Sequence, residues 1–383
     1  MKPFAKIPSK VPRSGIREIM ALAAEVDNVI HLAVGQPDFP TPSHIVDATC
    51  KYAREGHTKY VANAGTSELR AAAATYFQSR TGVATTPENI LVTPGAVMSC
   101  ASAFMALLEP GEEVLLPDPG WPNYEMAVSI LHGKPVTYNL RPENQFLPDL
   151  TELDSLVTDR TKLMVICSPS NPTGQVYDEK LMDGLVEFAR RHDLYLLSDE
   201  IYGEIVFDSK HVSALPFDTD GRSLIVSGMS KSYAMTGYRV GFTRAAPEYV
   251  ELATKLQEPF VSCGTGFSQL ASVQGLEGPQ ECVHEMRDEY KRRRDVAIEV
   301  LRSNDLYRYT PGGAFYLLVD ISATRKDSRE FALDLLEKKK VAVAPGNTFG
   351  NMCRDHVRIS FASKEEDIRE GLGRICEMIR EQS

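Results

Sequence analysis

The sequence predicts an α/β protein whose main sheet is mostly parallel and covered by helices on both faces. Between about residues 88 and 245, short apolar runs typical of buried strands alternate with stretches that have helical spacing. Strands that alternate with helices form parallel sheets, because each helix carries the chain back to the edge where the previous strand began. The chain has 383 residues, 43% of them hydrophobic, which is enough for a sizeable core in two or three domains.

The elements of this region can be placed from their apolar patterns and from the residues that end them. Pro110 and Gly111, for example, end the first helix. Ligands of parallel sheets lie beyond the carboxyl ends of the strands, and the candidate residues described below fall at or just past those ends. The expected elements are strand 90–93, helix 96–108, strands 113–117 and 162–167, helix 178–192, and strands 195–199, 224–227 and 239–243.

A second, smaller α/β unit is expected toward the carboxyl end of the chain. A long charged helix over residues 280–303 leads into it. The basic run 291–294 spreads around this helix, so we interpret it as a solvated face rather than a nucleic-acid patch. The expected elements of the smaller unit are strand 314–320, helix 328–338, strands 341–344 and 356–361, and helix 365–381.

Composition excludes several classes of function. The net charge of −10 argues against nucleic acid or an anionic membrane surface as a partner. The seven cysteines are scattered and contain no Cys-x-x-Cys pair, so the sequence indicates neither a disulfide framework nor a metal site. The amino-terminal segment lacks the apolar core of a secretory signal, and no apolar run approaches the length of a membrane span. These features fit a cytoplasmic protein without a bound metal.

The most informative stretch is 227–241, where Lys231 lies in a turn rich in small and hydroxyl residues between two expected strands. A lysine amine can form an imine with an aldehyde cofactor. Small neighbours let the backbone approach a phosphate, and the guanidinium of Arg239 can bind two phosphate oxygens at once. A surface lysine in a Ser/Gly loop is the alternative, which the flanking strands disfavour.

Two polar residues lie at or just past the ends of expected strands. Asp199 ends the strand 195–199, and a buried carboxylate needs a partner such as a protonated ring nitrogen. Its alternative role is that of a helix cap. Asn171 lies in Ser-Pro-Ser-Asn-Pro-Thr-Gly just after a strand, and on its own it is most simply a turn residue.

Two further features suit the binding of anions. Gly95, Ala96 and Val97 open a helix, and the backbone N–H groups at a helix start bind phosphates. In the strand 356–361, alternation places Arg358 on the face opposite Val357. A guanidinium that projects into an enclosed site can bind a carboxylate through two hydrogen bonds, but the strand alone also allows a surface arginine.

In their order along the chain, these motifs resemble those of the class I and II aminotransferases, fold-type I enzymes that carry pyridoxal 5′-phosphate (PLP). The resemblance covers nearly the whole chain and includes an early glycine motif over 32–42, with Gly35. It implies a large domain with a seven-stranded, mostly parallel sheet and a small domain built from both chain ends. The expected boundaries are 1–47 for an amino-terminal arm and part of the small domain, 48–280 for the large domain and 281–383 for the rest of the small domain.

The resemblance implies transamination between an L-amino acid and a 2-oxo acid by a ping-pong mechanism. Lys231 would form the aldimine with PLP and then move the substrate's α-proton as general base and acid. Asp199 would hold the pyridinium nitrogen, Tyr202 and Asn171 the phenolic oxygen, and Trp121 would stack on the ring. The residues expected around the phosphate are Gly95, Ala96, Val97, Ser230 and Arg239.

Further implied roles concern the substrate and a second subunit. Gly35, Asn171 and Arg358 would bind the substrate carboxylate. Tyr60 would reach the phosphate of the partner subunit, which implies a homodimer with shared active sites. Many members of the family carry serine where this chain has Gly228, so Ser230 or Ser227 would have to supply that hydroxyl.

Alternatives to transamination stay open from the sequence. Another PLP reaction on the same scaffold, such as C–S β-elimination, would use the same cofactor contacts. A regulator that uses such a domain as a ligand sensor would carry a DNA-binding extension before it. Gly35 comes too early in the sequence for such an extension, which disfavours a regulator. A nicotinamide dehydrogenase is disfavoured because no Gly-x-Gly-x-x-Gly occurs. The donor could be aspartate or an aromatic, branched or sulfur amino acid; Lys10, Arg13 and Arg17 are the candidates for binding a second carboxylate.

Overall fold

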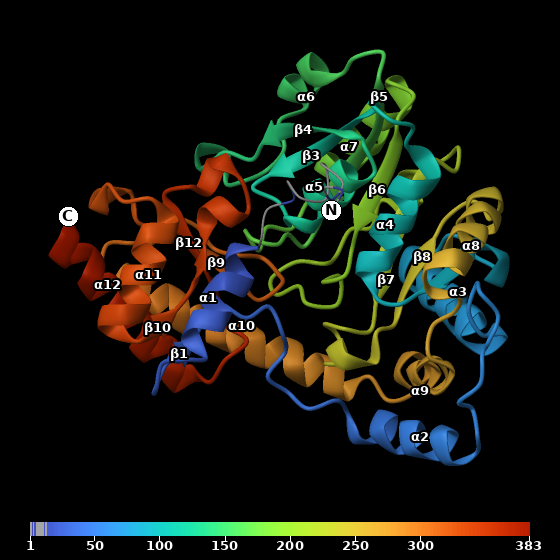
Figure 1. The fold of residues 1–383 in the computed structure, drawn as a ribbon, viewed down its shortest axis with the longest axis horizontal. Coiled ribbons are helices and arrows are strands. Elements are labelled where there is room, and N and C mark those ends of the chain that lie inside the picture. Colours follow the sequence, from blue (N-terminus) through green and yellow to red (C-terminus); the bar gives the residue numbers. More distant parts are fainter. Residues whose placement is uncertain (1, 3, 5–10, 12–13) are drawn as a thin grey trace.

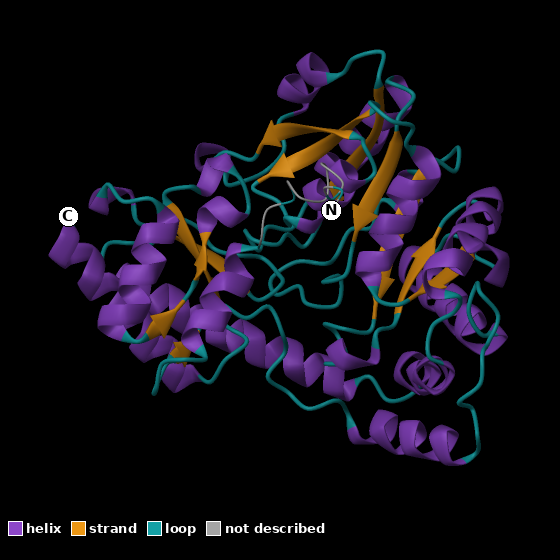
Figure 2. Ribbon diagram, viewed as in Figure 1, coloured by secondary structure: helices purple, strands orange, loops and turns teal. Residues whose placement is uncertain are grey.

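The computed structural model describes residues 2, 4, 11 and 14–383. Its main sheet has seven strands and is covered by helices (Figures 1 and 2). The strand order is β2-β8-β7-β6-β5-β3-β4, and every neighbouring pair is parallel except the two pairs made by β8. The expected mostly parallel α/β sheet is therefore confirmed. The strands are β2 (Ile90–Thr93), β3 (Glu113–Asp118), β4 (Lys134–Asn139), β5 (Thr161–Cys167), β6 (Tyr195–Asp199), β7 (Ser223–Gly228) and β8 (Gly241–Arg244).

Burial on both faces explains why the central strands have continuous apolar runs. Successive side chains of a strand point to opposite faces. In β5, Leu163 and Val165 belong to one hydrophobic cluster, whereas Met164 and Ile166 belong to the other. Both clusters are covered by helices, so neither face of the sheet needs polar side chains.

Helices from different parts of the chain cover the two faces (Figure 2). Cys100, Ala103 and Phe104 of α4 pack in the cluster on one face, and Met182 and Leu185 of α7 pack in the cluster on the other. The helices of this unit are α2 (Ser43–Arg54), α3 (Ser67–Thr81), α4 (Ala96–Leu107), α5 (Asn123–Ile130), α6 (Leu150–Leu156), α7 (Glu179–Arg191), α8 (Pro247–Val261) and α9 (Gly266–Glu277).

The smaller unit combines both ends of the described chain, with blue α1 beside red and orange elements in Figure 1. Its main sheet has the order β11-β12-β9, and β1 pairs with β10 in a separate two-stranded ladder. Its elements are α1 (Gly15–Ala23), β1 (Ile30–His31), α10 (Glu281–Arg302), β9 (Tyr316–Asp320), α11 (Ser328–Lys339), β10 (Val341–Ala342), β11 (Ala344–Pro345), β12 (His356–Ser360) and α12 (Glu365–Gln382).

The pairing of β1 with β10 supports the proposed small domain made from both chain ends. The proposed boundary at 47/48 falls inside α2, which packs against α9 of the larger unit. A boundary just before Ser43 therefore fits this helix better. No helix in the described part of the chain is long and apolar enough to cross a membrane.

Two expected strands differ from the structure. The single strand expected over 341–344 is two short strands, because β10 pairs with β1 and β11 pairs with β12. The strand expected from Arg239 begins only at Gly241. Arg239 itself has a left-handed backbone (φ 54°), which cannot continue a strand.

A hydrogen-bonded clasp joins the two units next to the site described below. The carboxylate of Asp118, at the end of β3, accepts the backbone N–H groups of Asn351 and Met352 at 3.0 Å each. Gly350 lies against this carboxylate with φ 136°, and a Cβ atom there would come within 2.1 Å of Asp118 Oδ1. The clasp fixes the neighbouring Phe349, whose ring lies 4.8 Å from the guanidinium carbon of Arg358.

Candidate active site

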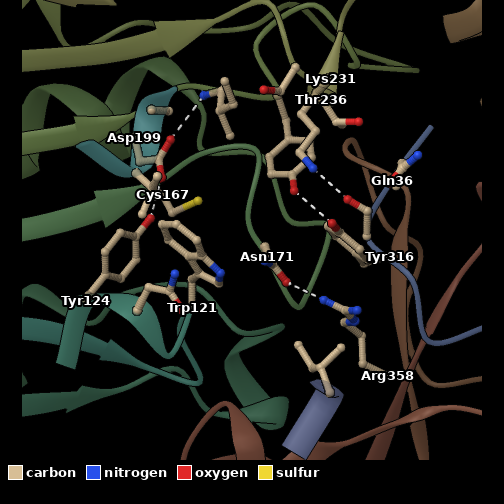
Figure 3. A pocket seen from close by; sticks show the side chains of 18 of the residues that line it. Gln36, Trp121, Tyr124, Cys167, Asn171, Asp199, Lys231, Thr236, Tyr316 and Arg358 are labelled. Atoms are coloured by element: carbon tan, nitrogen blue, oxygen red, sulfur yellow. Dashed lines mark hydrogen bonds between the residues drawn. The ribbon is translucent and has the colours of Figure 1, made fainter. Parts of the chain in front are cut away.

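A cavity of about 640 Å³ opens at the carboxyl ends of the central strands, and residues of the smaller unit form part of its wall (Figure 3). Ligand sites of open α/β sheets occur at this edge. Of the residues that the sequence predicted for the site, those that line the cavity are Gly35, Ala96, Val97, Trp121, Asn171, Asp199, Tyr202, Ser230, Lys231, Arg239 and Arg358.

Lys231 lies in the turn after β7, and its Nζ donates a hydrogen bond to the Gly35 carbonyl at 2.5 Å. None of the described carboxylates forms an ion pair with it. Burial, followed by the positive charges of Arg358 and Arg239, lowers the pKa of Lys231 to about 8. A substantial fraction of this amine is therefore neutral near physiological pH, and the neutral form is the one that acts as nucleophile or base.

Asp199 ends β6 with only 3% of its surface exposed. Its Oδ2 accepts from the Tyr124 hydroxyl at 2.5 Å, and its Oδ1 accepts from the Ile201 N–H at 3.2 Å. Burial raises the pKa of Asp199 to about 6, although these two hydrogen bonds lower it. Within the described ranges no cation forms an ion pair with this carboxylate, so its charge is left for a ligand to balance.

The start of α4 and Arg239 together form a cradle for an anion. Gly95 has φ 84°, and a Cβ atom there would lie 2.2 Å from Nη2 of Arg239. A Cβ atom on Gly241 would lie 2.4 Å from the backbone nitrogen of Ala96. Only glycine allows the guanidinium and the helix start to approach each other this closely.

The close packing of β7 against β8 explains the unusual Gly228. A Cβ atom at this position would lie 2.9 Å from Gly241 Cα, so a serine would not fit without movement. Of the two replacement hydroxyls expected, Ser230 lines the cavity, whereas Ser227 lines a different cavity between α3 and the segment 200–217. Thr236, which sequence reasoning missed, also lines the site (Figure 3).

Arg358 is buried, with 1% of its surface exposed, so a surface role is excluded. Its Nη1 donates to Oδ1 of Asn171 at 3.0 Å, and its Nη2 donates to the Ala33 carbonyl at 2.6 Å. The third guanidinium nitrogen, Nε, is buried and has no acceptor among the described residues. A buried guanidinium without a carboxylate partner is costly, and an anionic ligand would satisfy it.

Two tyrosines lie between these charged groups. The hydroxyls of Tyr202 and Tyr316 are 2.8 Å apart. A Cβ atom on Gly35 would come within 2.4 Å of the Tyr316 hydroxyl, so the glycine makes room for this contact. Sequence reasoning missed Tyr316, although it lies opposite Ser360 on the strand next to the one that carries Arg358.

Some predicted residues lie elsewhere. Tyr60 is 90% exposed and does not line the cavity of its own chain. Lys10 and Arg13 lie outside the described residues, whereas Arg17 of α1 lines the cavity. Trp121 lines the cavity, and its ring meets the Tyr124 ring edge-on at a centroid distance of 5.3 Å.

The donors and acceptors of the cavity fit PLP and an amino acid. The buried Asp199 carboxylate suits a protonated ring nitrogen, and the cradle at Gly95 and Arg239 suits a phosphate. Lys231 presents a largely desolvated amine, and no carboxylate in the described part of the chain pairs with Arg358. Each charge thus has a counterpart on these two molecules.

Comparisons with known proteins agree with this geometry. Residues 27–375 match the family model described as aminotransferase class I and II. The chain is 37% identical over 369 residues to an aspartate aminotransferase of Pyrococcus horikoshii, covering 95% of this chain and 94% of that protein. It also resembles the solved structure of the Thermus thermophilus aspartate aminotransferase with maleate (TM-score 0.94, 34% identity, 98% and 100% covered). A third match is the aromatic aminotransferase of Pyrococcus horikoshii OT3 (TM-score 0.90, 36% identity, 96% and 99% covered).

Proposed function

This chain belongs to the class I and II aminotransferases and is a PLP-dependent transaminase, and on that premise we propose that Lys231, Asp199 and Arg358 carry its reaction. An amino group moves from an L-amino acid to a 2-oxo acid in two half-reactions. PLP, when bound, supplies the electron sink for the carbanion that forms at the substrate Cα. The observation that carries the proposal is that all three residues face one cavity without an ion-pair partner among the described residues.

Lys231 is proposed as the residue that moves the proton. Its amine is held by the Gly35 carbonyl, and its lowered pKa of about 8 leaves part of it unprotonated near neutral pH. In that form Nζ can accept the proton of the substrate Cα and later return a proton. Burial, followed by the positive charges of Arg358 and Arg239, keeps the neutral form accessible.

The remaining cofactor contacts are proposed from the residues around Lys231. Asp199 would bind the ring nitrogen, and Tyr202 and Asn171 would donate to the phenolic oxygen. Trp121 would cover one face of the ring. The phosphate would be bound by the N–H groups of residues 95–97 together with Ser230, Thr236 and Arg239.

We further propose that the donor substrate is an acidic amino acid. Arg358 and Asn171 would bind its α-carboxylate. Arg17 offers a second guanidinium on the cavity wall, and no described carboxylate forms an ion pair with it. The names of the similar proteins support this class, because two are aspartate aminotransferases and one was solved with maleate, a dicarboxylate.

A donor panel with two arginine variants tests this assignment. Arg358→Gln should lower kcat/KM about 10²-fold or more for every donor, because all share the α-carboxylate. Arg17→Gln should lower kcat/KM only for aspartate and glutamate and leave phenylalanine unchanged. Equal losses with all donors in Arg17→Gln would contradict its proposed role. A wild-type preference for aromatic donors would overturn the acidic class itself, in line with the aromatic relative.

The nearest rival reaction is C–S β-elimination at the same cofactor. It would release pyruvate and ammonia from cystathionine without a 2-oxo acid acceptor. We expect no such release above the background of free PLP. Turnover of cystathionine that exceeds the rate of amino transfer to 2-oxoglutarate would make elimination the main activity.

We also propose a homodimer in which Tyr60 completes the partner's site. Tyr60 is 90% exposed, and Phe260 nearby is 66% exposed, which is unusual for large aromatic side chains. Their segments lie together, because the Val61 N–H donates to Sγ of Cys263 at 3.5 Å. A second copy of the chain would cover this aromatic surface, and the tyrosine hydroxyl can reach a charged oxygen.

Mixing two inactive variants tests the shared site. Lys231→Ala and Tyr60→Ala should each be impaired alone. A re-associated heterodimer would hold one site with both lesions and one site with neither, so activity should recover toward half of wild type. A verified heterodimer without recovery, or a monomer that is fully active, would refute shared sites.

A cytoplasmic location is proposed as well. All seven cysteines are free, and four of them are buried. A reducing compartment keeps such thiols reduced. Recovery of the protein mainly in a secreted or membrane fraction of its cell would contradict this location.

A further inference from the structure

Tyr124, which has no part in the reaction proposed above, donates a hydrogen bond to Asp199. It is the second residue of α5, and its side chain is 1% exposed. The hydroxyl lies 2.5 Å from Oδ2 of Asp199, and Figure 3 shows the two side chains facing each other. The Trp121 ring meets the tyrosine ring at an interplanar angle of 89°, so packing fixes the direction of the hydroxyl.

The tyrosine is the donor in this hydrogen bond. Burial and the neighbouring Asp199 carboxylate raise the pKa of Tyr124 well above its ordinary value, so the phenol keeps its proton. The carboxylate then accepts from Tyr124 at one oxygen and from the Ile201 N–H at the other. A hydrogen bond donated to a carboxylate favours its charged form.

We propose that Tyr124 is a positioning residue that orients Asp199 and holds it ionised, so that a proton shared with a bound ring nitrogen rests on the ring. The proposal rests on the proposed function, because it takes Asp199 to be the partner of that nitrogen. A proton on the ring makes the ring a better electron sink, whereas a proton on Asp199 would leave the ring neutral.

Other titratable groups also face Asp199 and have to be separated from the effect of Tyr124. The thiols of Cys100 and Cys167 stay neutral, because burial raises the pKa of each. The negative charge of Glu200 raises the pKa of Asp199, and Lys231 lowers it. Glu200 in turn contacts Nε2 of His211 at 2.8 Å, and both residues are unchanged in the variants compared below.

The chain offers a matched control for the loss of one hydroxyl. Tyr138 of β4 is also 1% exposed, and its hydroxyl donates to the Val165 carbonyl at 2.8 Å. Tyr138→Phe therefore removes a buried, hydrogen-bonded phenol oxygen in the same sheet that carries Asp199, and leaves every contact of Asp199 in place. Charges at Glu200, His211 and Lys231 are the same in both variants.

The primary test follows the Asp199 carboxyl carbon by ¹³C NMR in the cofactor-free, full-length chain as pH changes. We expect Tyr124→Phe to raise the pKa of Asp199 from about 6 to about 7 or higher, because a hydrogen bond to a charged group is lost. Tyr138→Phe should leave that pKa unchanged. Equal pKa values in the two variants would overturn the proposal.

A second measurement uses the holoenzyme. With ¹⁵N-labelled PLP, the ring-nitrogen signal should report loss of the ring proton at lower pH in Tyr124→Phe than in wild type or Tyr138→Phe.

If Tyr124→Phe does not fold, a variant with fluorotyrosine at position 124 takes its place. Its more acidic phenol donates more strongly, so the pKa of Asp199 should fall below the wild-type value, and a rise or no change would count against the proposal.

The two tests separate this inference from the proposed function. The carboxyl titration does not depend on whether Asp199 binds the cofactor. An altered titration with no change in the ring-nitrogen signal would show that Tyr124 acts on Asp199 but that Asp199 is not the ring partner. An unaltered titration overturns the role of Tyr124 whatever the cofactor does.

Discussion

Lys231→Ala should abolish transamination while the chain still folds and still binds PLP through its phosphate contacts. On the proposed mechanism, the variant loses both the amine that attaches to the cofactor and the base that moves the substrate's α-proton. General base catalysis alone contributes about 10²–10⁴-fold, so we expect kcat to fall by at least ~10⁴-fold when both functions are lost. Stopped-flow absorbance with aspartate as donor measures this directly.

An exposed lysine provides the control for this variant. Lys255 pairs with Glu251 at 2.8 Å on the surface of α8 and does not line the cavity. Lys255→Ala should retain wild-type kcat and KM, because exposed pairs of this kind contribute little. A Lys231→Ala protein that keeps more than a few per cent of wild-type kcat would contradict the role proposed for Lys231.

Asp199→Asn should slow the removal of the α-proton by about 10²–10³-fold or more, the cost of losing one preorganised electrostatic contact. The amide keeps the size of the side chain but cannot hold a proton on the ring nitrogen. Substrate affinity should change much less, because Arg358 and Asn171 are untouched. The Cα-deuterium isotope effect should rise, since proton removal then limits the rate. Near-normal turnover would remove Asp199 from the reaction.

The same substitution should stabilise the cofactor-free chain, and the sign follows from the pKa shift. The folded pKa of about 6 lies above the ordinary value of 3.8, so the fold disfavours the ionised carboxylate. This penalty is absent below about pH 4, grows up to about pH 6 and is fully present above it. At pH 7.5, Asp199→Asn should therefore raise the free energy of unfolding by up to ~3 kcal/mol. Unfolding in denaturant measures this difference.

Asp220 gives the opposite expectation and serves as the control for stability. Hydrogen bonds from Arg222 lower the pKa of Asp220, so its ionised form stabilises the fold. Asp220→Asn should therefore destabilise the chain slightly at pH 7.5, by about 0–1 kcal/mol, because the pair is at the surface. Destabilisation of the chain by Asp199→Asn as well would show that the buried carboxylate is not an uncompensated charge.

The central strands and the residues at their ends could be predicted because local signals agree there with the global fold. The apolar runs of β5, β6 and β7 predict buried strands, and a parallel sheet brings their carboxyl ends together. Asn171 and Lys231 follow two of these strands and Asp199 ends the third, so it was predictable that they share one cavity. The division of the expected strand 341–344 into β10 and β11 could not be predicted, because their partners, β1 and β12, lie on other segments of the chain.

Residues that act through distant contacts leave no local signal. Tyr124 and Asp199 are 75 positions apart in the chain, and Tyr202 and Tyr316 are 114 apart. Nothing in the sequence around Tyr124, Tyr202 or Tyr316 indicates which residue its hydroxyl contacts. The side-chain direction of Ser227 could not be predicted either. Its position in β7 turns it toward the cavity between α3 and the segment 200–217, and not toward the anion cradle at α4 and Arg239.

The central claim, that Lys231 is the lysine that bonds to PLP, is tested most directly by chemical trapping. Borohydride should fix the cofactor on the purified holoenzyme and remove its visible absorbance. Proteolysis and mass spectrometry should then find the added pyridoxyl phosphate mass on the peptide that contains Lys231, in close to one copy per chain. Finding that mass on another lysine, or on no lysine of a yellow protein, would contradict the account.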